Sequence, residues 1–256
     1  MSNAVKIAVD EQFAVGDAFT QAACAFRAKA GGKSALVMGG TGEVGREVVK
    51  HLLVSGAFDR VTVVGRRPVE YAGPHADRLE QKTVDYEDGA QLERDFGGHS
   101  HAFFCLGTTR AKSGADGFRK VDHDYALNAA RACKAAGVEH YSLCSASGAN
   151  KDSRFLYMRT KGEVDAEVAA MGFPRASIFR PAMLLCRREE SRIMERIAAF
   201  VVPALNFAMP DKLAIPTSTV AWAMVSDALK TGEAPAVSIF SNAEMLAAFR
   251  DGQQHP

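Results

Sequence analysis

A tyrosine and a lysine four residues apart are the first feature of the chain that could do chemistry. Tyr157 and Lys161 form the only Y-x-x-x-K pair in the sequence. A spacing of four places both side chains on one face of a helix, where the ammonium stabilises a phenolate and draws the tyrosine pKa down from about 10. Ser145 lies twelve residues upstream, after an apolar run, where its hydroxyl can hydrogen-bond a substrate oxygen. The three residues predict a general acid–base site in which Tyr157 moves the proton.

A glycine-rich turn is the second such feature. Gly39, Gly42 and Gly45 form a G-x-x-G-x-x-G pattern between a short apolar run and a helical pattern. Glycine tolerates positive φ, and its missing side chain lets the backbone approach a pyrophosphate at the positive end of the following helix. The pattern therefore predicts a dinucleotide-binding turn. The candidate contacts are Gly39, Thr41, Gly42, Glu43, Val44 and Gly45.

Two arginines stand where many NAD-binding sheets carry an acidic residue, at the end of the second strand. Arg66 and Arg67 can pair with the 2′-phosphate of NADP(H), which an aspartate would repel. We therefore expect NADP(H) as the cofactor; the alternative is that both arginines are solvated loop residues. Asp85, after the third run, either accepts a hydrogen bond from the adenine amine or serves only as a helix cap.

Small residues follow the fourth apolar run. Leu106, Gly107 and Thr108 stand at the carboxyl end of a predicted strand, which is the edge where ligands bind in open α/β sheets. Gly107 would let the backbone come close to the cofactor. We therefore predict that this loop contacts the cofactor.

The elements that must position these residues are short β-rich runs that alternate with helical patterns from Lys33 onward. This alternation predicts an α/β fold, a doubly wound parallel sheet of the Rossmann type with helices on both faces. We expect residues 33–256 to form a single NAD(P)-binding domain, with residues 183–235 shaping most of the substrate pocket. Residues 1–32 are expected to be an N-terminal extension outside the sheet. The seven runs are Ala35–Met38, Val61–Val64, Lys82–Val84, Ala102–Leu106, Tyr141–Cys144, Ala176–Phe179 and Val237–Phe240.

Composition narrows the partners. A formal net charge of +1 gives no electrostatic attraction to nucleic acid, and the longest apolar stretch, interrupted by Pro203, is too short for a membrane span. Five widely spaced cysteines without a C-x-x-C pair favour a reducing cytoplasm over a disulfide framework. His99 and His101 lack a third ligand, so no metal site is expected. Asp122, in a predicted helix, is interpreted as a solvated or capping charge.

Five motifs together resemble an atypical short-chain dehydrogenase/reductase, and more closely the Tat-interacting-protein oxidoreductase family. The similarity runs from about Lys33 to Lys230. The motifs are Gly39-Gly40-Thr41-Gly42-Glu43-Val44-Gly45, Gly65-Arg66-Arg67, Cys105-Leu106-Gly107-Thr108-Thr109-Arg110, Phe155-Leu156-Tyr157 with Lys161-Gly162-Glu163-Val164, and Phe179-Arg180-Pro181.

The resemblance assigns roles to the candidate residues. It implies that Tyr157 is the proton donor, that Lys161 lowers its pKa and binds the nicotinamide ribose, and that Ser145 polarises the carbonyl. Pro181 would border the nicotinamide. Where relatives carry Ser-Ser-Lys-Gly, this chain has Ser-Ala-Ser-Gly, so Ser147 is an alternative to Ser145 as the catalytic hydroxyl.

The predicted function is therefore an NADPH-dependent oxidoreductase that reduces a small carbonyl substrate. One alternative is a regulatory protein that binds NADP(H) with little turnover and presents a redox-dependent surface to a protein partner. Another is a nucleotide-sugar epimerase or dehydratase, which retains the cofactor. The oligomeric state stays open, with a homodimer among the options.

Overall fold

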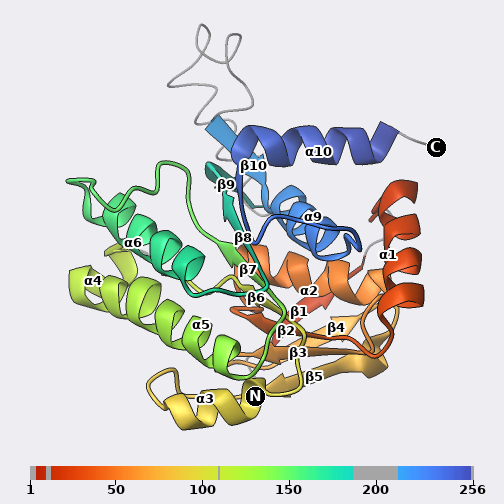
Figure 1. Ribbon diagram of the computed structural model, residues 1–256, viewed down its shortest axis with the longest axis horizontal. Coiled ribbons are helices and arrows are strands. Elements are labelled where there is room, and N and C mark those ends of the chain that lie inside the picture. The colour runs from red at the N-terminus through yellow and green to blue at the C-terminus, as the bar shows by residue number, and fades with distance from the viewer. Residues whose placement is uncertain (1–3, 10–12, 109, 187–212, 255–256) are drawn as a thin grey trace, which may run out of the picture.

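A seven-stranded parallel sheet forms the centre of the molecule (Figure 1). The structure is a computed structural model, which describes residues 4–9, 13–108, 110–186 and 213–254. The order of the strands confirms the doubly wound α/β sheet that the sequence predicts. In that order the strands are β11 (Val237–Ser241), β8 (Arg175–Arg180), β7 (His140–Cys144), β6 (His101–Phe104), β2 (Ser34–Met38), β3 (Arg60–Val64) and β5 (Leu79–Lys82).

Helices cover both faces of this sheet. Side chains on successive residues of a strand point to opposite faces, so a strand that is buried on both faces packs against both helical layers. Ala35 and Val37 of β2 pack into one apolar cluster, and Leu36 and Met38 pack into the other. Figure 1 shows the two helical layers on either side of the strands. The first layer holds α1 (Asp17–Ala30), α2 (Glu43–Ser55), α9 (Thr217–Ala228) and α10 (Asn242–Gln254). The second holds α3 (Gly89–Phe96), α5 (Tyr125–Ala135) and α6 (Leu156–Ala170).

Shorter elements complete the described chain. Two two-stranded parallel sheets lie beside the main one, and a π-helical turn joins two helices. The additional elements are β1 (Val5–Ala8) paired with β4 (Val69–Ala72), β9 (Met183–Leu185) paired with β10 (Ala214–Pro216), the 3₁₀ turn η1 (Ala76–Arg78), α4 (Arg110–Arg119) and the π turn η2 (Lys120–Asp124). Much of the predicted substrate region, residues 187–212, lies outside the described residues.

The third strand is displaced from its predicted position. The sequence predicts Lys82–Val84, whereas β5 covers Leu79–Lys82. β5 is an edge strand with largely exposed side chains, so it carries no apolar run, and the buried Val84 follows it in a loop. The apolar residue that suggested a strand, Val84, therefore lies just after the strand and not within it.

The N-terminal residues lie outside the main sheet but pack against the rest of the chain. Phe19 and Phe26 of α1 are buried in the first apolar cluster. The carbonyl oxygen of Val15 accepts a hydrogen bond from Trp222 Nε1 at 3.0 Å. β1 pairs with β4, the strand that follows Arg66 and Arg67 in the sequence. A division into residues 1–32 and 33–256 stays a prediction. In the described part of the chain, no helix has the length and apolar character needed to cross a membrane.

Three buried histidines make the fold sensitive to acid. Burial lowers the pKa of His51 to about 4, and it lowers the pKa values of His101 and His140 to about 3. Below pH 6.5 the unfolded chain therefore binds protons that the folded chain does not. The free energy of unfolding should fall on going from pH 6.5 to 4.5, by up to about 1.4 kcal/mol per pH unit for each histidine.

Urea unfolding at a series of pH values measures this effect. His51 Nδ1 lies 2.8 Å from the carbonyl oxygen of Glu47, a hydrogen bond that an asparagine amide can replace. His51→Asn should therefore keep the fold and weaken the pH dependence, by about one third of the effect of the three histidines. A wild-type free energy that is constant over this range would contradict the prediction.

Candidate functional site

The glycine turn between β2 and α2 is packed too tightly for side chains. Gly39 has φ +82°, and a Cβ on it would lie 2.6 Å from the Leu106 nitrogen at the end of β6. A Cβ on Gly45 would lie 2.1 Å from the Gly39 carbonyl oxygen. Gly42 donates its N–H to that oxygen at 2.9 Å and caps α2. The first-turn N–H groups of α2 have no partner within the helix, so they are free to donate hydrogen bonds to an anion placed at this helix end.

Other predicted residues of the turn have separate places. Val44 is buried in the first apolar cluster, and Glu43 forms an ion pair with Arg46. Thr41 Oγ1 accepts a hydrogen bond of 3.4 Å from Arg67, so this arginine reaches from the end of β3 to the glycine turn. Arg66 beside it is exposed. The structure thus brings Arg67 and the turn together.

Asp85 lies in a turn of its own. Its Oδ1 accepts the N–H of Glu87 at 2.9 Å, and its side chain is exposed. Asp88, not Asp85, caps α3, through a 2.9 Å hydrogen bond from the Gln91 N–H. Binding of adenine by Asp85 stays a prediction.

An ion pair that the sequence did not indicate holds Lys161. Its Nζ lies 2.7 Å from Oδ1 of Asp122, and both side chains are buried. The other oxygen, Oδ2, accepts the Thr108 N–H at 2.8 Å, which ties the loop after β6 to the same carboxylate. A Cβ on Gly107 would lie 3.2 Å from Asp122 Oδ1, which is a tight contact, so glycine at this position avoids crowding the carboxylate. Asp122 is therefore not the solvated or capping charge that the sequence suggested.

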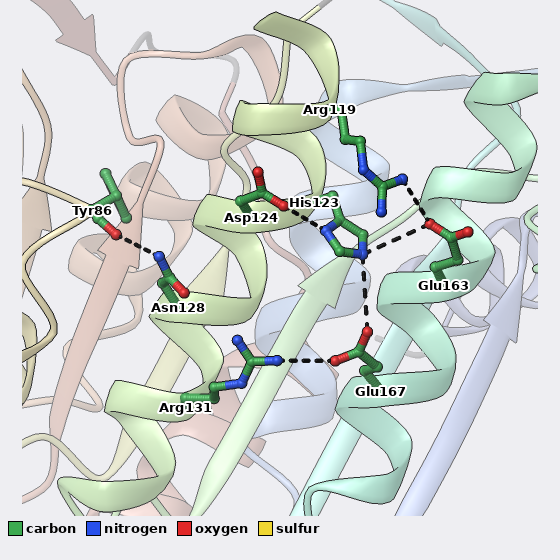
Figure 2. Close-up of polar contacts among 8 residues, drawn as sticks. All are labelled: Tyr86, Arg119, His123, Asp124, Asn128, Arg131, Glu163 and Glu167. Atoms are coloured by element: carbon green, nitrogen blue, oxygen red, sulfur yellow. Dashed lines mark hydrogen bonds and ion pairs between the residues drawn. The ribbon is translucent and has the colours of Figure 1, made fainter. Parts of the chain in front are cut away.

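One histidine of the π turn and two arginines that flank the turn hold it against α6. Figure 2 shows His123, whose Nδ1 lies 2.7 Å from Asp124 and whose Nε2 faces Glu163 and Glu167 of α6 at 3.7 and 3.9 Å. Arg119 and Arg131 pair with the same two glutamates, each at 3.1 Å. These contacts hold the π turn against α6 and thereby set the position of Asp122 opposite Lys161.

Tyr157 lies one helical turn before Lys161 and stays accessible. Its side chain stacks on Phe118, with ring centroids 5.6 Å apart, and the residue is 44% exposed. Partial burial raises the pKa of Tyr157, against the opposing effect of Lys161 and with the help of Asp122. The lowered pKa expected from the Tyr157/Lys161 spacing is therefore wrong for this structure, because burial outweighs the effect of the Lys161 ammonium and Asp122 adds to the upward shift.

Ser145 and Ser147 point to different environments at the end of β7. Ser145 is 7% exposed, and its Oγ forms no hydrogen bond of normal geometry with the described residues. It lies close enough to the buried Asp165 to lower that carboxyl's pKa, which burial raises overall. Ser147 is exposed and donates its N–H to the Pro181 carbonyl oxygen at 2.7 Å. Of these two serines, Ser145 is the one with a buried hydroxyl that has unused hydrogen-bonding capacity.

The arrangement fits a dinucleotide at the carboxyl edge of the sheet. Gly39 and Gly45 lie in close backbone contacts that exclude a Cβ, so the turn keeps a compact backbone without side chains, as a pyrophosphate-binding turn requires. Two cationic groups lie along this edge of the sheet. Arg67 is beside the glycine turn, and Lys161 is beside the loop after β6. Thr109 lies outside the described residues.

Comparison with known proteins agrees with this geometry. The model of a family described as NAD(P)H-binding matches residues 39–198. Protein HTATIP2 of Rattus norvegicus is 41% identical over 200 residues, which cover 78% of this chain and 83% of that protein. Protein FMP52-1, mitochondrial, of Scheffersomyces stipitis is 34% identical over 224 residues, covering 85% of this chain and 99% of that protein.

Solved structures share the fold at low sequence identity. MoeE5 in complex with UDP-glucuronic acid and NAD superposes with a TM-score of 0.62 at 16% identity, over 82% of this chain and 76% of that one. ElxO with NADP bound gives 0.60 at 13% identity, over 84% and 99%. These likenesses support the Rossmann-type architecture.

The fungal relatives correct one expectation. Proteins from Scheffersomyces stipitis, Emericella nidulans and Debaryomyces hansenii that are 34% identical to this chain are named mitochondrial. This finding contradicts the cytoplasmic location inferred from the cysteines. Cysteine spacing reports the absence of a disulfide framework, and it does not distinguish one reducing compartment from another.

Proposed function

Because the chain belongs to the NAD(P)H-binding family and is a relative of HTATIP2, we propose that it is an NADP(H)-dependent oxidoreductase that reduces a small carbonyl compound. The observation that carries the proposal is the accessible phenol of Tyr157 one turn from a buried, charge-paired Lys161, at the same sheet edge as the glycine turn. Bound coenzyme would supply hydride chemistry.

The residues of the chain have distinct roles in this proposal. Gly39, Gly42 and Gly45 bind the pyrophosphate at the start of α2, and Leu106, Gly107 and Thr108 lie along the coenzyme, with Pro181 near its reactive end. Lys161 binds a ribose hydroxyl while Asp122 holds its ammonium in place. Ser145 orients the carbonyl oxygen.

Tyr157 donates the proton to that oxygen. A raised pKa keeps the phenol protonated at neutral pH, which suits a general acid and disfavours the reverse reaction, in which the phenolate would act as a base.

One observation favours coenzyme binding without turnover as a second candidate function. Asp122 offsets the charge of Lys161, so the phenol is less activated than the Tyr/Lys spacing alone suggests. Spectrophotometric assays of NADPH oxidation over a panel of aldehydes and ketones, together with calorimetric binding of NADPH, separate the two. Turnover supports the oxidoreductase, binding without turnover supports the second candidate, and no binding overturns both.

Selectivity for NADP(H) over NAD(H) is expected to depend on the two arginines after β3. Replacing Arg66 and Arg67 by alanine removes charge-assisted hydrogen bonds to a 2′-phosphate, each of which is worth roughly 1.5–3 kcal/mol. The dissociation constant for NADPH should rise by at least about tenfold, while that for NADH stays within about twofold.

Calorimetric titration with both coenzymes measures this ratio. The matched control is Arg94→Ala, which removes an exposed arginine of α3. An unchanged NADPH:NADH ratio in the Arg66/Arg67 variant would show that these arginines are solvated loop residues.

A further inference from the structure

A second pocket lies at the opposite edge of the sheet from the glycine turn. Its volume is about 350 Å³. His101, His140 and Arg175 line it, and they are the first residues of β6, β7 and β8, paired side by side in register. The strands are parallel, so their amino ends form this pocket while their carboxyl ends form the candidate coenzyme site.

Positive charge is concentrated around this pocket. Lys29, Lys33, Lys230 and Arg175 line it, and Glu139 is the one lining carboxylate among the described residues. Lys33 pairs with Glu139 at 2.7 Å, whereas Arg175 and Lys230 share a single oxygen of Asp227, at 2.7 and 3.1 Å. Lys29 donates to the Thr231 carbonyl oxygen at 2.8 Å. Four cations thus face two carboxylates, an excess that an anion would offset.

Two buried nitrogen atoms of the lining residues have no hydrogen-bond partner in the described part of the chain. They are Arg175 Nε, a donor, and His140 Nδ1. Ser177 Oγ donates to Asp227 at 2.7 Å, so its oxygen accepts from His140 Nε2–H at 2.9 Å. His140 Nδ1 therefore carries a lone pair and can accept a hydrogen bond.

We propose that this pocket is a second ligand site, which binds the phosphate group of a small molecule. The donors approach from α1, from β8 and from the segment after α9, and this convergence suits a tetrahedral group with oxygens in several directions. Lysine ammonium groups bind phosphate as point charges, and arginine adds directed N–H donors. A singly protonated phosphate also has an O–H that His140 Nδ1 can accept, whereas a fully ionised sulfate does not. The site is thus independent of the coenzyme edge.

The ring carbon–proton signals of His101 and His140 in NMR spectra report on this pocket directly. The titration uses inorganic phosphate on the full chain, with and without saturating NADPH, so that phosphate bound at the glycine turn is recognised. We expect both ring signals to shift saturably in either condition. Loss of one hydrogen bond, worth about 1 kcal/mol, makes sulfate at equal ionic strength about fivefold weaker. Glycerol 3-phosphate replaces inorganic phosphate in a parallel titration, which tells a phosphorylated metabolite from the free ion.

Substitution of two exposed lysines tests the charge argument without disturbing the core. Lys29→Gln combined with Lys230→Gln should weaken phosphate binding by at least about tenfold, because each removes a charge-assisted contact. Lys151→Gln, at an exposed position that does not line the pocket, is the control and should leave the affinity unchanged. The proposal is overturned by shifts that never saturate, by equal affinity for sulfate and phosphate, or by a double variant that binds like the wild type.

Discussion

Replacing Tyr157 by phenylalanine is expected to lower kcat/KM for carbonyl reduction by about 10²- to 10⁴-fold, the range for loss of a positioned general acid. The substitution removes one oxygen from a ring that is 44% exposed and stacked on Phe118. We therefore expect the fold of the described chain not to depend on this hydroxyl. The free energy of unfolding and the affinity for NADPH should therefore stay close to their wild-type values.

Steady-state assays with a carbonyl substrate, beside calorimetric titration of NADPH, measure both quantities. Tyr125→Phe is the matched control, because Tyr125 is another tyrosine, and its hydroxyl donates to an exposed carboxylate, Glu87, at 2.9 Å, away from the candidate site. It should retain full activity. Unchanged turnover in Tyr157→Phe would remove the proton-donor role and leave coenzyme binding as the function to explain.

Local pattern was sufficient to predict the sheet and the glycine turn. β2 is buried along its whole length, so both of its faces require apolar residues and the run is visible in the sequence. Gly39 and Gly45 occupy positions where a Cβ would meet backbone atoms, and such a steric demand fixes the residue type. The edge strand β5 has neither property, and for this reason its position was misjudged.

Asp122 could not be found from the sequence, because its role depends on contacts between distant segments. It meets Lys161 only where the π turn packs on α6, and that packing depends on His123, Glu163 and Glu167 (Figure 2). The Tyr157/Lys161 spacing predicts an activating lysine, but a spacing does not reveal a third charge. Burial of the phenol and the Asp122 charge together outweigh Lys161, so the pKa of Tyr157 is raised where the spacing predicts a lowered one, although the predicted helix is right.

Removing the Asp122 carboxylate should produce the largest loss of stability of any substitution at the site. Asp122→Ala leaves the Lys161 ammonium buried without its partner at 2.7 Å, and it leaves the Thr108 N–H without an acceptor. Breaking a buried ion pair on one side costs about 3–5 kcal/mol in the free energy of unfolding. Urea unfolding at pH 7 measures this loss, and a change below about 1 kcal/mol would show that the pair is hydrated. Asp124→Ala, at the more exposed neighbour, should cost far less.

Asp122→Asn separates the charge of this side chain from its hydrogen bonds. The amide oxygen can still accept from Thr108 or Lys161, so the variant should be more stable than Asp122→Ala. Loss of the negative charge leaves the Lys161 ammonium unopposed beside Tyr157, which should lower the pKa of the phenol. Ultraviolet titration of phenolate absorbance, with Tyr157→Phe as the subtraction, measures that pKa without any assay of activity. A phenol that titrates as in the wild type would mean that Asp122 positions Lys161 without governing the proton.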